Sequence, residues 1–152
     1  MYTYHPVVEI LVKSFGTTPE SLEPLHEQLL AYRENTDGLK DALLKHNVTS
    51  ETAFQQALAS YYELDYRESF NDIPVVREYT EIIPIRYAKK NIFFPLKKEK
   101  NTLEVAITNP ELSQPLDDLA RHFKCHIELV LSHKQAVLDL INRAYDESSA
   151  ST

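Results

Sequence analysis

The stretch LEVAITNPELSQPLDDLARHFKCHIELVLS, residues 103–132, decides the fold of the second half of the chain. Apolar residues alternate with other residues from Leu103 to Ile107, which predicts a half-buried strand. Asn109-Pro110 suits a turn, because the residue before a proline is held extended and the proline fixes the bend. An amphipathic helix and a second strand, HIELVLS, then follow. This order of strand, helix and strand implies a right-handed crossover within one small mixed sheet.

A further strand is expected just before this stretch. The segment IFFPLKKEKNTLEVAIT predicts a hairpin whose turn lies at residues 98–101. Pro95 places the first strand of the hairpin at a sheet edge or at a bulge, since proline cannot donate a ladder hydrogen bond. Upstream, REYTEIIPIRYAKKN predicts helical turns broken at Pro84. Downstream, Ser132 and Gln135 have the spacing of a capping box for a last helix.

The first 61 residues show helical periodicity in four short segments. Thr18 followed by Pro19 is typical of a helix start, although Pro24 predicts a kink or a later start. The fourth helix is expected to begin at Thr49 or Ser50. Helices this short are marginal alone, so they must pack on one another.

We therefore predict an α+β fold with two parts. Residues 1–66 form a bundle of short helices. Residues 67–145 form a small α/β subdomain with a three-stranded mixed sheet and flanking helices, and residues 146–152 form a polar tail or linker.

Composition excludes several classes of function. The net charge of -7 argues against binding to nucleic acid, and only two glycines occur in the 152 residues, so no phosphate-binding loop can form. The chain also lacks a membrane-spanning apolar run and a secretory signal pattern, which predicts a cytoplasmic protein without direct membrane insertion. A basic island interrupts the acidic chain and is expected to be solvated surface rather than an anion or partner site. Its members are Arg86, Lys89, Lys90, Lys97, Lys98 and Lys100.

No arrangement of residues predicts catalysis or metal binding. Asp117 and Asp118 are adjacent, so their side chains point to different sides of a helix, where they suit the positive end of its dipole. His122 is assigned to a helix and His126 to a strand, with Cys125 between them, so the helical geometry that would bring these potential zinc ligands together is lost. We expect no catalytic residues, no metal and no cofactor.

The second half of the chain resembles a known family. The sequence from IIPIRYAKKN to NRAY is similar to the amino-terminal domain of the type II secretion and type IV pilus assembly ATPases, the general secretory pathway protein E family. In that family a proline-bearing helix with an alanine leads to a strand ending in Pro-Leu, and then come an LxVAxxxP strand, an acidic helix, a strand and a helix with a terminal tyrosine. The matching residues are Pro84, Ala88, Pro95, Leu96, Leu103, Val105, Ala106, Pro110, Asp117, Asp118, Leu119 and Tyr145.

The first half resembles the leucine-spaced repeat of the same family. In some members two such repeats bind cyclic di-GMP. This chain has Gly38 at the position of the repeat's arginine, Lys40 at that of its early glycine and Tyr61 at that of its final glutamine. The repeat's apolar positions, which are the candidate ligand- or partner-binding residues, are Leu39, Leu43, Phe54 and Leu58.

The resemblance implies a non-catalytic docking domain. In the family this region precedes the ATPase motor and links it to the cytoplasmic part of an inner-membrane platform protein. The chain would then lie in the cytoplasm, held at the inner membrane through that partner, and would be joined to a motor if it is an excised domain. The alternative is a regulatory domain that senses cyclic di-GMP, and a small enzyme is the third hypothesis.

Overall fold

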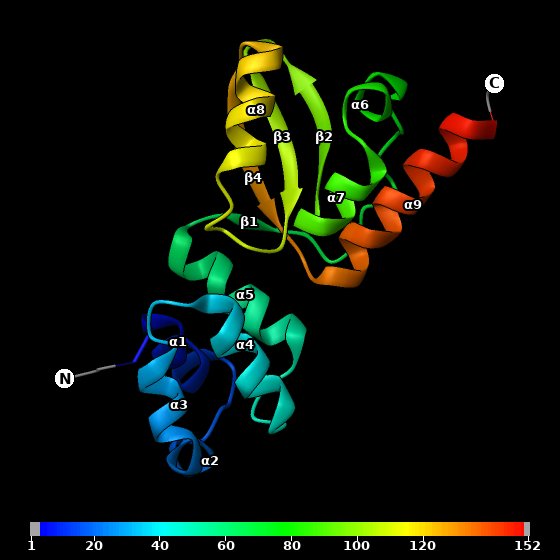
Figure 1. Ribbon diagram of the computed structural model, residues 1–152. Coiled ribbons are helices and arrows are strands. Elements are labelled where there is room, and N and C mark those ends of the chain that lie inside the picture. Colours follow the sequence, from blue (N-terminus) through cyan, green and yellow to red (C-terminus); the bar gives the residue numbers. More distant parts are fainter. Residues whose placement is uncertain (1–3, 151–152) are drawn as a thin grey trace. The chain divides into compact units, whose positions relative to one another are not determined.

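The chain divides into two compact units, residues 1–64 and residues 65–152. The computed structural model describes residues 4–150, with side chains described as far as residue 146. Figure 1 shows the first unit in blue to cyan-green and the second in green to red. We describe each unit by itself.

Over residues 4–64, the first unit contains helices and no strand. Its elements are α1 (Pro6–Ser14), α2 (Pro19–Leu22), the 3-10 turn η1 (Glu23–Leu25), α3 (His26–Ala31), α4 (Thr36–Lys45) and α5 (Glu51–Tyr62). α5 begins after Ser50, whose side chain accepts a hydrogen bond from the Ala53 amide over 3.1 Å. This is the cap expected from the sequence.

Pro24 breaks the second expected helix into three pieces. It lies in η1, between α2 and α3, because proline lacks the amide that an uninterrupted helix would use. Thr18 precedes α2 with extended backbone, but its side chain makes no capping hydrogen bond. The predicted kink is therefore confirmed, whereas Thr18 is an N-cap by position only.

The core of the helical unit lies between its longest helices. α1 packs against α5, and α4 packs against both α3 and α5. The largest buried side chains of this core are Leu11, Leu29, Leu39, Leu43, Phe54 and Leu58.

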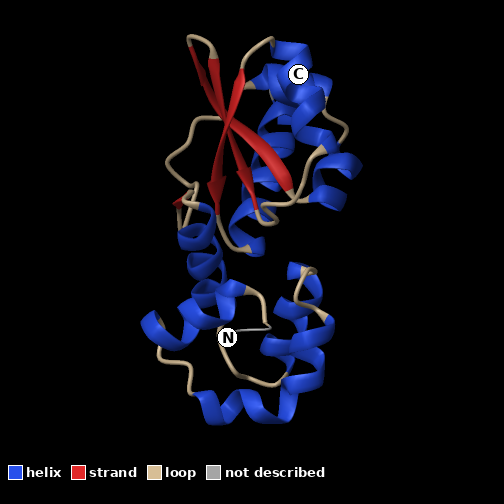
Figure 2. Ribbon diagram, turned by 90° about the vertical axis from the view of Figure 1, so that its left-hand side faces the viewer, coloured by secondary structure: helices blue, strands red, loops and turns tan. Residues whose placement is uncertain are grey.

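The second unit is built on a four-stranded sheet of order β1-β4-β3-β2. The strands are β1 (Asp65–Tyr66), β2 (Phe93–Glu99), β3 (Thr102–Ile107) and β4 (His126–Leu131). β3 runs antiparallel to β2 and parallel to β4, which makes the sheet mixed. Figure 2 shows the strands in red with helices packed beside them.

The sheet has four strands, not the three expected. The added strand is β1, which pairs in parallel with Val130 and Leu131 of β4. Two residues are too few to show a strand period, and the partner strand is remote in sequence, so local patterning could not find it. The hairpin of β2 and β3 is confirmed. β2 is an edge strand, and its register shifts between Pro95 and Lys97, as the proline predicted.

Four helices complete the second unit: α6 (Arg77–Ile82), α7 (Ile85–Asn91), α8 (Gln114–Phe123) and α9 (Lys134–Ala150). α9 packs on β2, α6 and α7, which Figure 1 shows grouped together, and α8 packs on β4. α6 and α7 are separated at Pro84, as expected. The buried aromatic residues Phe93 and Phe94 of β2 lie in this core, and the Phe94 ring meets Tyr79 and Tyr145 edge to face.

The last helix differs from its prediction at both ends. The Ser132 amide donates to the Ile107 carbonyl over 3.0 Å, and the Gln135 side chain bonds Asp139, so these two residues do not form the reciprocal bonds of the predicted capping box. At the other end, the sequence analysis expected a polar tail or linker over residues 146–152, and α9 continues to Ala150. No glycine or proline interrupts residues 134–150, so nothing in the chain stops the helix there.

Candidate functional site

The helical unit contains a groove of about 640 Å³ between α1 and the segment that begins at α2. This volume lies within the usual range of ligand-binding clefts. Val8 and Leu22 are buried at its floor, and Val12 is half-buried. The lining residues are Tyr4, Val8, Glu9, Val12, Lys13, Pro19, Leu22, Glu23 and His26. We call this feature the α1–α2 groove.

The sequence of α1 explains why the groove is apolar. The helix reads PVVEILVKS, and its apolar residues cover more than the one face that packs on α5. Val7 and Leu11 are fully buried, whereas Val8 and Val12, four residues apart, line the groove. An apolar excess on a short helix was the signal for this site, and the sequence reasoning assigned no function to it.

Charged and polar groups form the rim of the α1–α2 groove. Lys13 pairs with Glu9 over 2.6 Å, and Glu23 is exposed. The Tyr4 hydroxyl and the His26 Nδ1 atom are hydrogen-bonded at the rim, and their rings meet edge to face. Residues 19–31 contain three glutamates and no lysine or arginine, so this wall of the groove is acidic.

The candidate residues of the leucine repeat lie inside the helical core. Leu39, Leu43 and Phe54 have no exposed surface, and Leu58 is 2% exposed. All four side chains contribute to packing in this conformation, and their role in binding stays a prediction. None of them lines the α1–α2 groove.

Gly38, where the repeat of the family has arginine, is crowded by an aromatic ring. A Cβ atom built on Gly38 would lie 2.5 Å from Cδ1 of Tyr32. The Gly38 amide also donates to the Asn35 side chain, which caps α4. The position thus has no room for a larger side chain unless Tyr32 moves.

The polar residues at the corner between β3 and α8 shape a turn and the start of a helix. Asn109 Oδ1 accepts a hydrogen bond from the Glu111 amide over 2.9 Å, which shapes the turn. Asp117 lies in the first turn of α8, where its charge complements the helix dipole. Asp118 lies 3.8 Å from Arg121 and 3.5 Å from the Tyr87 hydroxyl. Desolvation first, and then this carboxylate, raise the pKa of Tyr87.

The histidines and the cysteine of HFKCHIE do not converge. His122 is exposed on α8, His126 is exposed on β4, and Cys125 is half-buried between them. Among residues 4–150, no group of three or more His, Cys, Asp or Glu side chains is placed to hold a metal ion. The basic island is exposed on α7 and at the β2–β3 turn.

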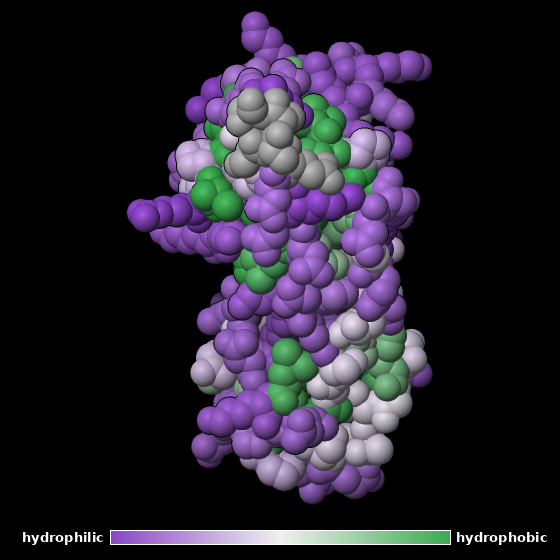
Figure 3. Space-filling model, turned by 90° about the vertical axis from the view of Figure 1, so that its right-hand side faces the viewer, coloured by the Kyte–Doolittle hydropathy of each residue, from purple (hydrophilic) through white to green (hydrophobic). Residues whose placement is uncertain are grey.

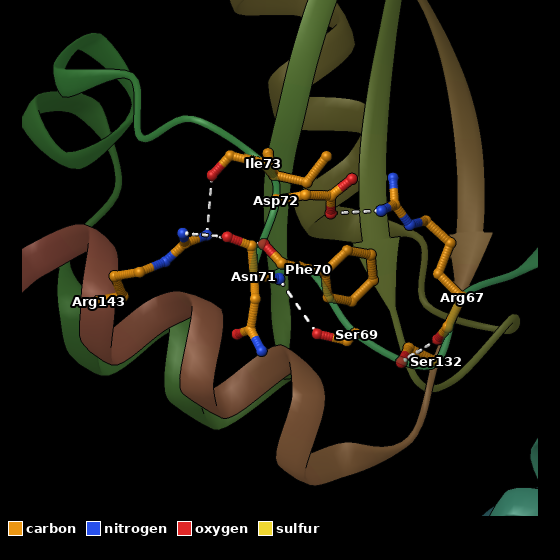
Figure 4. Close-up of polar contacts among 8 residues, drawn as sticks. All are labelled: Arg67, Ser69, Phe70, Asn71, Asp72, Ile73, Ser132 and Arg143. Carbon is orange, nitrogen blue, oxygen red and sulfur yellow. Dashed lines mark hydrogen bonds and ion pairs between the residues drawn. The ribbon is translucent and has the colours of Figure 1, made fainter.

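A polar cluster holds the segment after β1 against the rest of the second unit (Figure 4). Arg143 of α9 donates to three main-chain carbonyls, those of Phe70 at 2.8 Å, Ile73 at 2.9 Å and Asn71 at 3.0 Å. Arg67 pairs with Asp72 over 2.5 Å, and its hydrogen bond is the main reason why the pKa of Asp72 is lowered. These hydrogen bonds and this ion pair join residues of the second unit to one another, so the cluster has a structural role.

Tyr145 fastens α9 to the turn between α6 and α7. Its hydroxyl donates to the Ile83 carbonyl. Burial raises the pKa of Tyr145 to about 12.

Two further observations bear on the membrane and on the surface. Within the part of the chain that the structure describes, no helix has the length and apolar character needed to cross a bilayer. On the face drawn in Figure 3, apolar side chains form separate patches within a mostly hydrophilic surface.

Comparison with known families identifies the chain. The family model of the MshEN domain matches residues 62–151, which is more than half of the chain. The chain belongs to the MshEN domain family. This confirms the expected relation to the amino-terminal domains of the type II secretion and type IV pilus assembly ATPases.

Solved structures show the same fold over both units of this MshEN domain. The structure of MshE with cdg has a TM-score of 0.69 and 20% identity, and the match covers 91% of this chain and 98% of that one. The N-terminal domain of XpsE matches in two crystal forms. The first form has a TM-score of 0.65 and 20% identity, and the match covers 90% of this chain and 92% of that one. The second form has a TM-score of 0.57 and 18% identity, and the match covers 90% of this chain and 93% of that one. No curated protein matches the chain significantly in sequence.

The XpsE matches show how much of an N-terminal domain the chain covers. Both XpsE structures are of an N-terminal domain, and this chain spans more than nine-tenths of each. The chain therefore has the fold of these N-terminal domains over nearly their whole length.

Proposed function

We propose that this MshEN domain is a docking domain, which links a secretion or pilus assembly ATPase to the cytoplasmic domain of an inner-membrane platform protein. The observation that carries the proposal is the family match over residues 62–151, together with the structural match to the N-terminal domain of XpsE. A domain of this kind acts by presenting surface to a partner rather than by chemistry of its own.

The side-chain arrangement supports a binding role. The Asn109 side chain shapes the turn at the β3–α8 corner, Asp117 lies at a helix start, and the polar cluster around Arg143 holds a loop. The α1–α2 groove, by contrast, has an apolar floor that the rest of its own unit does not fill. In this proposal the domain lies in the cytoplasm and is held at the inner membrane by its partner.

Calorimetric titration of the chain with the cytoplasmic domain of the cognate platform protein tests the proposal. We expect a saturable complex of defined stoichiometry. A flat titration with a folded partner would overturn the docking role.

The alternative function is cyclic di-GMP sensing. Its support is the likeness to MshE, whose structure was solved with cdg, and the presence of a groove of suitable volume. The site chemistry is less favourable, since residues 1–64 contain nine acidic and four basic residues and glycine replaces the arginine of the repeat at position 38. An anionic ligand would meet like charge there.

Thermal denaturation distinguishes the two functions. A ligand at about 100 times its dissociation constant stabilises the folded state by roughly 2.7 kcal/mol, which raises the melting temperature by several degrees. We expect no such increase with cyclic di-GMP.

A further inference from the structure

We propose that the α1–α2 groove takes a basic, amphipathic helix of the docking partner. The inference rests on the proposed docking function and assigns it a surface and a partner chemistry. It concerns the helical unit alone, which lies almost entirely outside the residues that the family model matches.

The apolar part of the groove fits the apolar face of a helix. Val8 and Val12 lie one turn apart on α1, and Leu22 faces them from the opposite wall. Grooves between helices commonly accept a helix that presents apolar residues at positions i, i+3, i+4 and i+7. Val8 and Leu22 are only 2% and 6% exposed and shape the floor, whereas the half-buried Val12 keeps apolar surface that a partner helix would remove from water together with its own.

The charges of the rim select a basic partner. On the α1 wall, Glu9 and Lys13 neutralise each other in an ion pair. On the opposite wall Glu23 lines the groove, and Glu20 and Glu27 are exposed in the same segment. The net potential at the rim is therefore negative, and lysine or arginine beside the apolar face of the partner would complement it.

The same charges disfavour an anionic occupant. A cyclic dinucleotide carries two phosphates, and the only lysine or arginine that lines the groove among the described residues is Lys13, which already pairs with Glu9. A basic helix thus fits both the apolar floor and the acidic wall, whereas a nucleotide fits the floor alone.

Fluorescence anisotropy with the full chain and two labelled synthetic peptides tests this inference. The first peptide carries leucines at i, i+3, i+4 and i+7 and lysines on both flanks. The second keeps the leucines and has glutamates in place of the lysines. We expect the lysine peptide to bind at least about ten-fold more tightly than the glutamate peptide, with a difference that shrinks as salt is raised. Equal affinity for the two peptides would overturn the inference.

Matched variants test whether the lysine peptide binds in the α1–α2 groove. Val12→Lys puts a charge into the groove at a half-buried position and should weaken the lysine peptide about ten-fold. Glu23→Lys reverses a rim charge and should weaken it about three- to five-fold, whereas Glu34→Lys makes the same change at an exposed position away from the groove and should have a smaller effect. Glu23 and Glu34 are both exposed, so folding is expected to survive either change, and circular dichroism checks it for all three variants.

Two results would count against the groove and leave the docking function standing. If Glu23→Lys and Glu34→Lys weaken the lysine peptide equally, the peptide binds by net charge alone. If the platform domain binds the Val12→Lys variant as tightly as the unaltered chain, docking uses another surface. Displacement of the lysine peptide by cyclic di-GMP would instead assign the groove to the nucleotide and overturn the inference.

Discussion

Arg143 of α9 donates a 2.8 Å hydrogen bond to the main-chain carbonyl of Phe70, a residue 73 positions earlier in the chain. The same guanidinium bonds the carbonyls of Asn71 and Ile73. One side chain of the last helix therefore holds the loop that follows β1. This contact fixes the start of the α/β unit to its last helix.

Replacing Arg143 should destabilise the second unit. Arg143→Ala removes three hydrogen bonds from a charged donor, and we expect a loss of about 2 kcal/mol in the free energy of unfolding, measured by urea denaturation. Arg143→Lys keeps the charge without the planar fork and should lose about half as much. Arg121→Ala is the control, since the Arg121 side chain is 77% exposed and lies 3.8 Å from Asp118. An equal loss in the two alanine variants would contradict this role of Arg143.

Gly38 should resist substitution because of Tyr32. Alanine favours a helix over glycine by about 1 kcal/mol, but its Cβ would lie 2.5 Å from the Tyr32 ring. We expect Gly38→Ala to destabilise the chain by about 1–2 kcal/mol in thermal denaturation. The same substitution made in a Tyr32→Ala background should be neutral or stabilising. Additive effects of the two substitutions would show that the ring does not cause the restriction.

The two helix starts of the first unit provide a matched pair of caps. Ser50 accepts a hydrogen bond from the Ala53 amide, whereas the Thr18 side chain makes no capping hydrogen bond. Ser50→Ala should therefore cost about 1 kcal/mol of stability, and Thr18→Ala much less. Urea denaturation of both variants measures the difference, which should disappear if α5 begins elsewhere in solution.

Tyr145 should make stability depend on pH in the alkaline range. Its pKa is about 12 in the folded chain, against an ordinary value of 10.0, so the folded state keeps the proton longer than the unfolded state does. The resulting stabilisation is complete below pH 10 and is lost as the pH rises from 10 to about 12.

Tyr145→Phe removes this contribution. The free energy of unfolding of the variant should therefore fall less steeply between pH 10 and 12 than that of the unaltered chain. Denaturant unfolding at several pH values measures the slope. Parallel profiles for the two proteins would contradict the raised pKa.

Local signals in the sequence predicted most of the second unit. Pro95 predicted an edge strand or bulge and Pro84 a helix break, and both effects are local consequences of the missing amide. The strand β1 was missed because two residues carry no period and their partner lies in β4. The predicted capping box was wrong because the Ser132 amide, which the Gln135 side chain would have bonded, donates to the Ile107 carbonyl instead.

The candidate site was harder to predict than the fold. The repeat positions of the family pointed to Leu39, Leu43, Phe54 and Leu58, whose side chains pack in the core. The groove depends on how the second face of α1 meets Leu22, and only the folded unit brings these residues together. An amphipathic pattern shows that a helix has an apolar face but does not show which part of that face stays uncovered.

The docking function is tested most directly by titrating the full chain in a calorimeter, first with the cytoplasmic domain of its platform protein and then, separately, with cyclic di-GMP. The account predicts a saturable complex with the protein domain and no heat of binding with the nucleotide. Binding of cyclic di-GMP without binding of the platform domain would contradict it and would make the chain a nucleotide sensor.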